Sequence, residues 1–362
     1  MLYRGMKENG EDVQPCHYTG TLQKQWLYET FRPDVVLGVG YWKDTPDIIL
    51  HPQKFNLPPV PWFIADGLVA DYHAILSALP LVVVPCHWVR ETYQRDGVET
   101  KNFVVIPIGL EPEVYRPVPK TDQRVKRIRH ILGVQDDEIL LTTIGGDVTS
   151  KGAQEVLQAL KIVNQHFQKW KYVLKIWGGG TAVDHRENEQ RLIRELGEAQ
   201  DRVSYQAGIF SRDFMSYFLS ACDIYVAPSR LEGFGMIQVE AQSCGIPVVS
   251  IDAMGPQDTI RHGQTGYLAR VAKTVMREKK SWNPAAPSRG LAPGAHQSGQ
   301  PIIMEYHADP AELAHYLLTL MTDAKLRQTL GTNARAHVIK NFEYHKIART
   351  MAAVIKDKYR LS

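Results

Sequence analysis

The most informative stretch of the chain is residues 228–249, which read Pro228-Ser-Arg-Leu-Glu-Gly-Phe-Gly-Met-Ile-Gln-Val-Glu-Ala-Gln-Ser-Cys-Gly-Ile-Pro-Val-Val249. An apolar run at residues 224–227 precedes it and is typical of a buried strand. A helix is expected to begin near Gly235. The stretch therefore predicts a strand, a glycine-containing turn and a helix, which is the repeating unit of a doubly wound α/β sheet.

The glycine turn is expected to bind an anion. Its two glycines leave the backbone amides of residues 233–236 approachable, and the helix dipole presents its positive end there. Glu232 lies before the helix and Glu240 inside it, and carboxylates accept hydrogen bonds from sugar hydroxyls. A lone Gly-x-Gly turn is more often a plain connection with a capping glutamate. The two glutamates and the following Gly245-Ile-Pro247 favour a diphosphate site flanked by hydroxyl-rich groups.

The same alternation of short apolar runs and longer amphipathic segments extends over most of the chain and predicts parallel sheets with crossover helices. Strands are expected at residues 12–18, 34–39, 60–65, 81–84, 103–107, 139–144, 172–177, 203–206, 224–227, 247–250 and 266–268. Helices are expected at residues 22–31, 87–96, 153–167, 187–196, 212–221, 236–244, 310–322, 325–341 and 345–359.

The length of 362 residues predicts two domains. A polar, proline-bearing segment at residues 107–129 is interpreted as the linker, which gives domains at residues 1–118 and 119–345 and a final helix at residues 346–362. Residues 272–300 are rich in Lys, Pro, Gly, Ala and Ser and poor in apolar residues. We interpret them as a mobile surface insertion.

Composition excludes several classes of protein. The 42 Lys and Arg residues against 39 Asp and Glu give a formal charge of +3, which does not indicate nucleic-acid binding. No apolar run reaches the roughly 18 residues of a membrane-spanning helix, and residues 1–12 do not resemble a signal peptide. Four cysteines without a Cys-x-x-Cys pair favour a reduced, cytoplasmic setting. Peripheral contact with a membrane stays open.

The spacing of Glu232 and Glu240 resembles the E-x7-E motif of the retaining glycosyltransferases of family 4, whose GT-B fold has two Rossmann-like domains facing a cleft. Other segments resemble the same family. They are Val105-Ile-Pro-Ile-Gly109 with Tyr115-Arg-Pro117, Trp177-Gly-Gly-Gly180, Val203-Ser-Tyr-Gln-Ala-Gly208, and Ala253-Met-Gly-Pro-Gln-Asp258 with Gly263-Gln-Thr-Gly266.

The resemblance implies that the two domains bind different substrates. Residues 1–118 would bind the acceptor, residues 119–345 would bind the nucleotide sugar, and the helix at 346–362 would return to the first domain. The activity implied is transfer of a sugar from a UDP- or GDP-linked donor to a hydroxyl acceptor with retained anomeric configuration. No metal or other cofactor is implied. A GT-B phosphorylase or epimerase, or a catalytically silent nucleotide-sugar-binding protein, are the alternatives.

The resemblance also assigns roles to residues. Glu240 would bind the ribose hydroxyls and Glu232 the donor sugar. Lys151, which follows the first strand of the second domain, would pair with the diphosphate and stabilise the charge on its departure; alone, it would be interpreted as a solvated lysine at a helix start. The turn residues that would line the donor pocket are Gly233, Phe234, Gly235 and Met236.

Two positions depart from the family pattern. An arginine usually precedes the lysine, whereas this chain has Gly145-Gly146-Asp147, and Arg230 is our candidate to replace its charge. A histidine often follows the strand that corresponds to residues 60–65, whereas this chain has Asp66. We take Asp66 as the catalytic candidate there, with a helix cap as the alternative and His73 as the second choice.

The amino terminus differs from the family as well. Residues 1–10 resemble the end of the family's first helix, so the strand and glycine-rich loop that precede this helix in the family are missing. Either the start codon is assigned late or the central strand is supplied differently. The first explanation is the simpler one.

The role of Glu240 gives the first testable prediction. Replacing Glu240 by alanine removes a carboxylate that accepts hydrogen bonds from the ribose, so nucleotide binding should weaken by about 1.5–3 kcal/mol while the fold stays intact. Calorimetric titration with UDP, GDP and ADP measures this change. An unchanged affinity for all three nucleotides would contradict the assignment of the ribose site.

Overall fold

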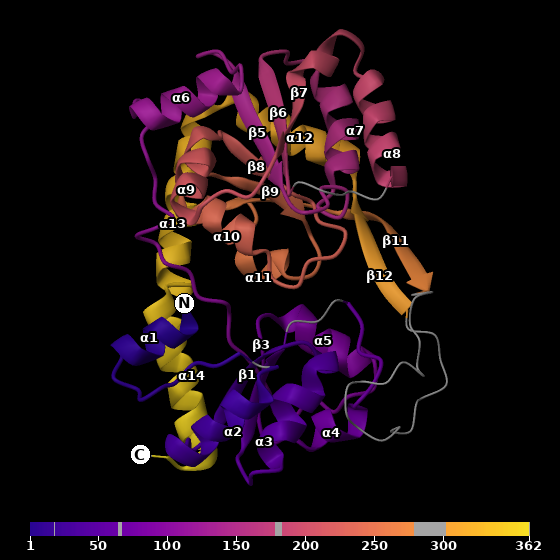
Figure 1. The fold of residues 1–362 in the computed structure, drawn as a ribbon. Coiled ribbons are helices and arrows are strands. Elements are labelled where there is room, and N and C mark those ends of the chain that lie inside the picture. Colours follow the sequence, from indigo (N-terminus) through magenta and orange to yellow (C-terminus); the bar gives the residue numbers. More distant parts are fainter. Residues whose placement is uncertain (18, 64–66, 178–182, 279–301, 362) are drawn as a thin grey trace. The chain divides into compact units, whose positions relative to one another are not determined.

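The computed structural model describes residues 1–17, 19–63, 67–177, 183–278 and 302–361. These residues form two compact units (Figure 1). Unit 1 comprises Met1–Gly109, Met276–Met304 and Tyr344–Ser362, and unit 2 comprises Leu110–Val275 and Glu305–Glu343. The chain therefore passes between the units at Gly109, at Val275, at Met304 and at Glu343, and each unit has its own parallel sheet.

The sheet of unit 2 has six parallel strands in the order β10-β9-β8-β5-β6-β7. The side chains of β5, β8 and β9 are all buried, as expected for strands covered on both faces by helices, whereas those of the edge strand β7 are partly exposed. The strands are β5 (Ile139–Ile144), β6 (Trp170–Ile176), β7 (Val203–Ala207), β8 (Ile224–Val226), β9 (Val248–Ile251) and β10 (Gly266–Ala269). The helices are α6 (Gln123–Ile131), α7 (Ala153–Val163), α8 (Val183–Arg194), η3 (Gly197–Arg202), α9 (Arg212–Ala221), α10 (Met236–Ser243), α11 (Pro256–Thr259), α12 (Pro310–Thr322) and α13 (Ala324–Asn341).

The strand order reverses between β5 and β8. From β5 the chain steps outward to β6 and β7, and from β8 it steps the other way to β9 and β10. Right-handed crossovers then place α7 and α8 on one face of the sheet and α9 and α10 on the other; α7 packs against α8 and α12, whereas α9 packs against α6 and α10. The loops that follow β5 and β8 therefore lead to helices on opposite faces of the sheet, and this is the position at which doubly wound folds bind ligands.

The predicted linker at residues 107–129 is wrong in its second half, because α6 begins at Gln123. Asp122 caps this helix by accepting a hydrogen bond from the backbone N–H of Arg124 at 2.8 Å. Only Val125 and Ile128 of the helix are buried. With so few apolar residues among many basic ones, the segment carries a weak periodic signal.

The predicted insertion at residues 272–300 begins inside a strand. β11 (Val271–Glu278) pairs with β12 (Ile302–Ala308) in a separate two-stranded sheet. β11 carries the β-branched residues Val271, Thr274 and Val275 between basic ones, which is compatible with an exposed strand and which composition alone does not reveal. The remaining residues of the predicted insertion, 279–300, lie outside the described part of the chain.

The sheet of unit 1 has four parallel strands in the order β1-β2-β3-β4. They are β1 (Val36–Gly40), β2 (Pro59–Phe63), β3 (Val82–Val84) and β4 (Phe103–Val105). The helices are α1 (Leu2–Glu8), α2 (Thr21–Thr30), η1 (Trp42–Asp44), η2 (Pro46–Leu50), α3 (His51–Gln53), α4 (His73–Ala78), α5 (His87–Arg95) and α14 (Tyr344–Tyr359).

The first element of unit 1 is a helix, as residues 1–10 indicate. The strand predicted at residues 12–18 is wrong, since residues 11–17 form no strand and residue 18 lies outside the described chain. Pro15 lacks a backbone donor, and Val13 is the only aliphatic side chain in this short segment. The segment therefore has too little apolar surface to join the sheet.

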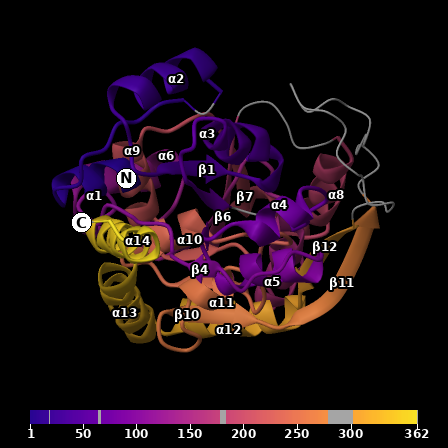
Figure 2. The same ribbon diagram turned by 90° about the horizontal axis from the view of Figure 1, so that it is seen from below.

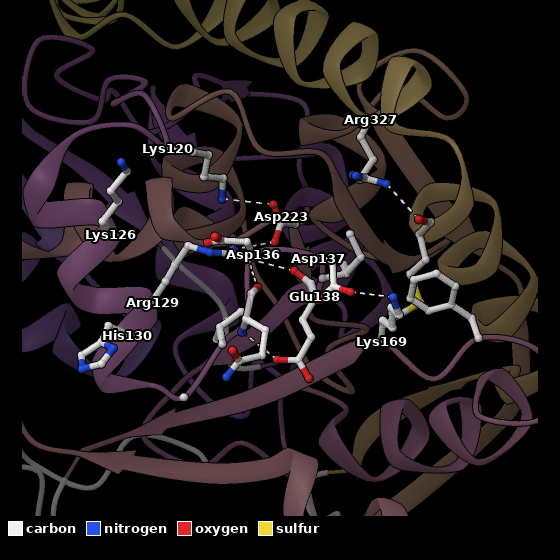
Figure 3. Close-up of a pocket in the computed structure, with 16 residues that line it drawn as sticks. Lys120, Lys126, Arg129, His130, Asp136, Asp137, Glu138, Lys169, Asp223 and Arg327 are labelled. Atoms are coloured by element: carbon white, nitrogen blue, oxygen red, sulfur yellow. Dashed lines mark hydrogen bonds and ion pairs between the residues drawn. The ribbon is translucent and has the colours of Figure 1, made fainter.

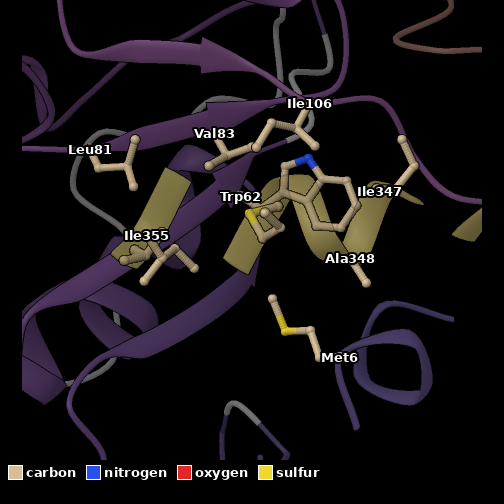
Figure 4. Close-up of a cluster of buried hydrophobic side chains, with 10 residues drawn as sticks. Met6, Trp62, Leu81, Val83, Ile106, Ile347, Ala348 and Ile355 are labelled. Atoms are coloured by element: carbon tan, nitrogen blue, oxygen red, sulfur yellow. The ribbon is translucent and has the colours of Figure 1, made fainter. Parts of the chain in front are cut away.

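Helix α14 belongs to unit 1, although it follows all of unit 2 in the sequence. It packs against α1, beside which it lies in two perpendicular views (Figures 1 and 2). A Cβ at Gly5 of α1 would lie 2.9 Å from the Cβ of Ala348, so the two helices approach closely. Figure 4 shows the core that results, in which one stripe of α14 meets α1 and the sheet. Its members are Met6, Val60, Trp62, Leu81, Val83, Ile106, Ile347, Ala348, Met351 and Ile355.

Within the residues that the structure describes, no helix is long and apolar enough to cross a membrane.

The buried stripe of α14 predicts the cost of a truncation at its centre. Met351 is 0% exposed, so Met351→Ala should leave a cavity and lower the free energy of unfolding by about 2–5 kcal/mol. Met276, which is 71% exposed, provides the matched control, and Met276→Ala should change stability by less than about 0.5 kcal/mol. Chemical denaturation of both variants measures the difference. Equal effects would show that α14 does not complete the core of unit 1.

Candidate donor site

The loops after β5 and β8 meet at the point where the strand order of unit 2 reverses. The backbone N–H of Arg230 donates to the carbonyl of Ser150 at 2.9 Å, which joins the two loops. Gly152 has a positive φ of 81°, and a Cβ there would lie 2.3 Å from the carbonyl oxygen of Pro228. A side chain would force the loops apart, so glycine is required for this close approach.

Lys151 and Glu232, both candidates from the sequence, form an ion pair at this junction. The Nζ of Lys151 lies 2.6 Å from Oε2 of Glu232, and the side chains are 25% and 17% exposed. The aliphatic part of Lys151 lies over Gly145, where an added Cβ would be 2.7 Å from its Cγ. The Oε1 atom of Glu232 accepts a hydrogen bond from the N–H of Gly235 at 3.1 Å. One carboxylate thus binds both the lysine and the start of α10.

The glycine turn presents its backbone at the start of α10. Gly235 caps the helix with a φ of 91°, a conformation that residues with side chains rarely adopt. Phe234 contributes only its backbone, because its ring is buried against Phe342, with 5.7 Å between ring centroids. A Cβ at Gly255 would lie 2.6 Å from the Cα of Phe234, so the loop after β9 supports the turn from behind. Met236 is the first residue of α10 and is partly buried.

Glu240 lies on α10 beside Tyr115 and Arg212. Burial raises the pKa of Glu240 to about 7, although the hydrogen bond from Tyr115 and the positive charge of Arg212 act to lower it. The charge of Arg212 is shared with Glu111, whose Oε2 lies 2.5 Å from the guanidinium. The carboxyl of Glu240 therefore holds its proton more tightly than an exposed glutamate does; it can donate a hydrogen bond when protonated and accepts one when ionised.

Tyr115 and Arg212 were not predicted from the sequence to be site residues. Tyr115 stands in Tyr115-Arg-Pro117, a segment recognised for its resemblance but given no role, and Arg212 is the first residue of an ordinary amphipathic helix. Their meeting with Glu240 is a tertiary contact between residues far apart in the sequence. No local pattern could have predicted it.

Arg230, our candidate for the missing arginine, is directed into α7 instead of toward Lys151. Its side chain is buried, with Nε 3.0 Å and Nη2 2.8 Å from Oε1 of Glu155 and Nη2 2.9 Å from Oε1 of Gln154. The desolvation of Glu155 acts to raise its pKa, but a hydrogen bond from His307 and the charge of Arg230 outweigh this effect and leave the pKa lowered. The guanidinium thus neutralises a buried carboxylate.

The loop that lacks the usual arginine is covered by an aromatic ring. A Cβ at Gly146 would lie 2.9 Å from Cε3 of Trp177, so a longer side chain at Gly146 would have to displace the indole.

The structure gives less information on Asp66 and His73, the catalytic candidates of unit 1. Asp66 lies outside the described residues. His73 is the first residue of α4 and is half-buried. The predicted catalytic group of unit 1 therefore stays a prediction.

A cavity of about 760 Å³ lies elsewhere on unit 2 (Figure 3). Its lining includes Glu138 and Ile139, so it opens at the amino ends of the strands, opposite the loops that carry Lys151 and Glu232. Its charged groups largely neutralise one another, with Lys169 2.5 Å from Asp137 and Arg129 2.8 Å from Asp223. The described residues also contain no group of three or more His, Cys, Asp or Glu side chains that could hold a metal ion.

Comparison with known proteins finds a family match within unit 2. Residues 125–276 match the model of the glycosyl transferases group 1. The chain is 28% identical over 289 residues to D-inositol 3-phosphate glycosyltransferase of Kribbella flavida, covering 74% of this chain and 66% of that protein. It is 29% identical over 178 residues to the protein of the same name from Paenarthrobacter aurescens, covering 49% and 42%. The matched regions thus span less than two-thirds of these relatives.

Solved structures share the fold over nearly the whole chain. Sucrose-phosphate synthase from Thermosynechococcus elongatus has a TM-score of 0.69 at 20% identity, covering 94% of this chain and 78% of that one. Alr3699/HepE of Anabaena, solved with UDP-glucose, has a TM-score of 0.70 at 19% identity, covering 95% and 84%. The fold is GT-B, as predicted from the sequence.

The raised pKa of Glu240 predicts how pH changes stability. Ionising the buried carboxyl opposes folding, so its contribution to stability is complete below its ordinary pKa of 4.5 and is lost as pH rises through about 7. Relative to Glu240→Gln, the wild-type chain should lose about 3 kcal/mol of unfolding free energy between pH 4 and pH 8. Urea denaturation of both chains at several pH values measures this loss.

The matched control is Glu187→Gln, which changes an exposed glutamate of the same unit. It should leave the pH profile unaltered. If wild type and Glu240→Gln show parallel profiles, the carboxyl of Glu240 is not held in a desolvated environment.

Proposed function

We propose that the chain, whose residues 125–276 match the model of the glycosyl transferases group 1, transfers a sugar from a nucleotide-diphosphate donor to a hydroxyl acceptor with retained anomeric configuration. The observation that carries this proposal is the Lys151–Glu232 ion pair, which lies at the start of α10 where the strand order reverses. A cation, helix amides and a carboxylate that accepts from hydroxyls are the groups that a sugar diphosphate requires.

In the proposed reaction the donor diphosphate lies against Lys151 and the amides of the glycine turn. As the bond between the anomeric carbon and the phosphate oxygen breaks, negative charge grows on that oxygen. The ammonium of Lys151 and the helix dipole stabilise it without reorganisation of solvent. The departing phosphate oxygen takes the proton of the acceptor hydroxyl, which attacks from the same face, so the configuration is retained.

Glu232 has a second role in this proposal. Its carboxylate neutralises Lys151 before the donor binds. When the diphosphate takes over the charge of the lysine, the carboxylate becomes free to accept hydrogen bonds from the hydroxyls of the donor sugar. The exchange keeps the lysine paired in both states and avoids the cost of an isolated, partly buried charge.

The nucleoside portion is proposed to extend toward Glu240, with the ribose hydroxyls hydrogen-bonded to its carboxyl. UDP-glucose is the first donor to test, because the Anabaena neighbour was solved with it; GDP-linked donors stay the second choice. Inositol 3-phosphate is the first acceptor to test, because it appears in the names of the curated relatives.

The test combines binding with product analysis. The full chain should bind UDP or GDP in calorimetric titrations and transfer the sugar from its donor to an acceptor, and NMR of the product should show the anomeric configuration of the donor. Lys151→Met should weaken binding of the nucleoside diphosphate by about tenfold or more, since it removes a charge-assisted contact. Lys161→Met changes an exposed lysine on the following helix α7 and should alter neither nucleotide binding nor sugar transfer.

Other outcomes point to the alternatives. Nucleotide binding without transfer or donor hydrolysis would identify a catalytically silent binding protein. Sugar release that requires inorganic phosphate would identify a phosphorylase, and conversion of the donor without an acceptor would identify an epimerase. A chain that binds none of the nucleoside diphosphates would overturn the proposal.

A further inference from the structure

A buried carboxylate joins three segments of unit 2 that are separated in the sequence. Glu155 lies in the first turn of α7, four residues after Lys151. Its Oε1 atom is contacted by Arg230, two residues before Glu232, and by Nδ1 of His307 on β12, at 2.7 Å. The two loops that hold the Lys151–Glu232 pair are thereby connected to the ribbon formed by β11 and β12.

The backbone makes the same connection a second time. The N–H of Tyr306 donates to the carbonyl of Arg230 at 2.9 Å, while the N–H of Arg230 donates to the carbonyl of Ser150 at 2.9 Å. Arg230 is therefore fixed on both sides of its backbone and through its guanidinium. Because Arg230 is fixed, the positions of Glu232, two residues later, and of Lys151, next to Ser150, are also restricted.

The hydrogen bonds of Glu155 are unevenly shared between its two oxygens. Arg230 Nε, Arg230 Nη2 and His307 Nδ1 all contact Oε1, whereas Oε2 is buried and has no hydrogen-bond partner. An arginine facing a carboxylate ordinarily uses both oxygens in a two-pronged pair. Here the imidazole approaches the same oxygen as the guanidinium and holds the carboxylate in an orientation that the arginine alone would not favour.

We propose that His307 is a positioning residue for the donor site, acting through Glu155 and Arg230 on the Lys151–Glu232 pair. Without the imidazole, the carboxylate of Glu155 turns to satisfy Oε2, the guanidinium follows it into a two-pronged pair, and the loop that carries Glu232 shifts. The ribbon, whose strand β11 overlaps the insertion predicted at residues 272–300, is thereby a component of the site. This inference rests on the proposed function for the identity of the ligand, but not for the mechanical coupling.

The coupling is tested first without any ligand. In His307→Leu, amide hydrogen exchange should rise about tenfold in peptides covering residues 148–156 and 228–236, and should stay unchanged in α9 and in unit 1. His307→Asn, whose amide can donate near the position of Nδ1, should restore slow exchange. His166→Leu, which changes an exposed histidine of the same unit, should match the wild type.

A double-mutant cycle tests the route of the coupling. If His307 acts through Glu155, then His307→Leu should add little to the faster exchange of Glu155→Gln. In the wild-type background, His307→Leu should also weaken UDP binding by about fivefold to tenfold, as expected for the loss of an interaction with a charged group. His307→Asn should recover most of this affinity.

The outcomes separate this inference from the proposed function. Unchanged exchange in both peptides of His307→Leu, faster exchange throughout unit 2, or additive effects in the cycle would overturn the role of His307. A wild-type chain that binds no nucleoside diphosphate would overturn the proposed function alone, because the exchange measurements would still decide the coupling.

Discussion

Gly152 meets Pro228 at a distance that no side chain would permit, and the candidate site depends on this contact. Two loops that leave adjacent strands toward opposite faces of a sheet would ordinarily diverge. Because Gly152 allows them to touch, the lysine of one loop reaches the glutamate of the other. The backbone of Gly235 and the support from Gly255 then hold the turn that completes the arrangement.

The charged side chains of the site are paired with one another. Lys151 has Glu232, Arg212 has Glu111, and Glu240 accepts a hydrogen bond from Tyr115. Arg230 differs from these groups, since it is buried with Glu155 and holds the two loops together rather than contacting a ligand. The Lys151–Glu232 pair is partly exposed on both sides and can exchange partners at little cost, whereas the buried carboxylates Glu111 and Glu155 resist change because each would be left unpaired and desolvated.

The sequence predicted the repetitive parts of the fold and the local part of the site. β5 has the expected ends because its short run of residues is fully buried, and α9 and α12 have them because their N-caps Ser211 and Asp309 agree with their apolar periodicity. Helix α6 and the β11–β12 ribbon were not predicted, because their few apolar residues stand among many charged ones and give only a weak periodic pattern. Lys151 and Glu232 were candidates because of the family resemblance, whereas their ion pair and the contacts of Tyr115 and His307 depend on tertiary packing, which no single segment encodes.

The place of α14 in unit 1 has a consequence for the synthesis of the chain. The ribosome releases residues 1–109 first, yet their core needs Ile347, Met351 and Ile355, which emerge only after all of unit 2. Unit 2 is complete when Glu343 has emerged, so it can fold while the first-made part of the chain still exposes Met6 and Trp62. During that interval the nascent chain presents an unfilled apolar surface, which is the kind of surface that chaperones bind.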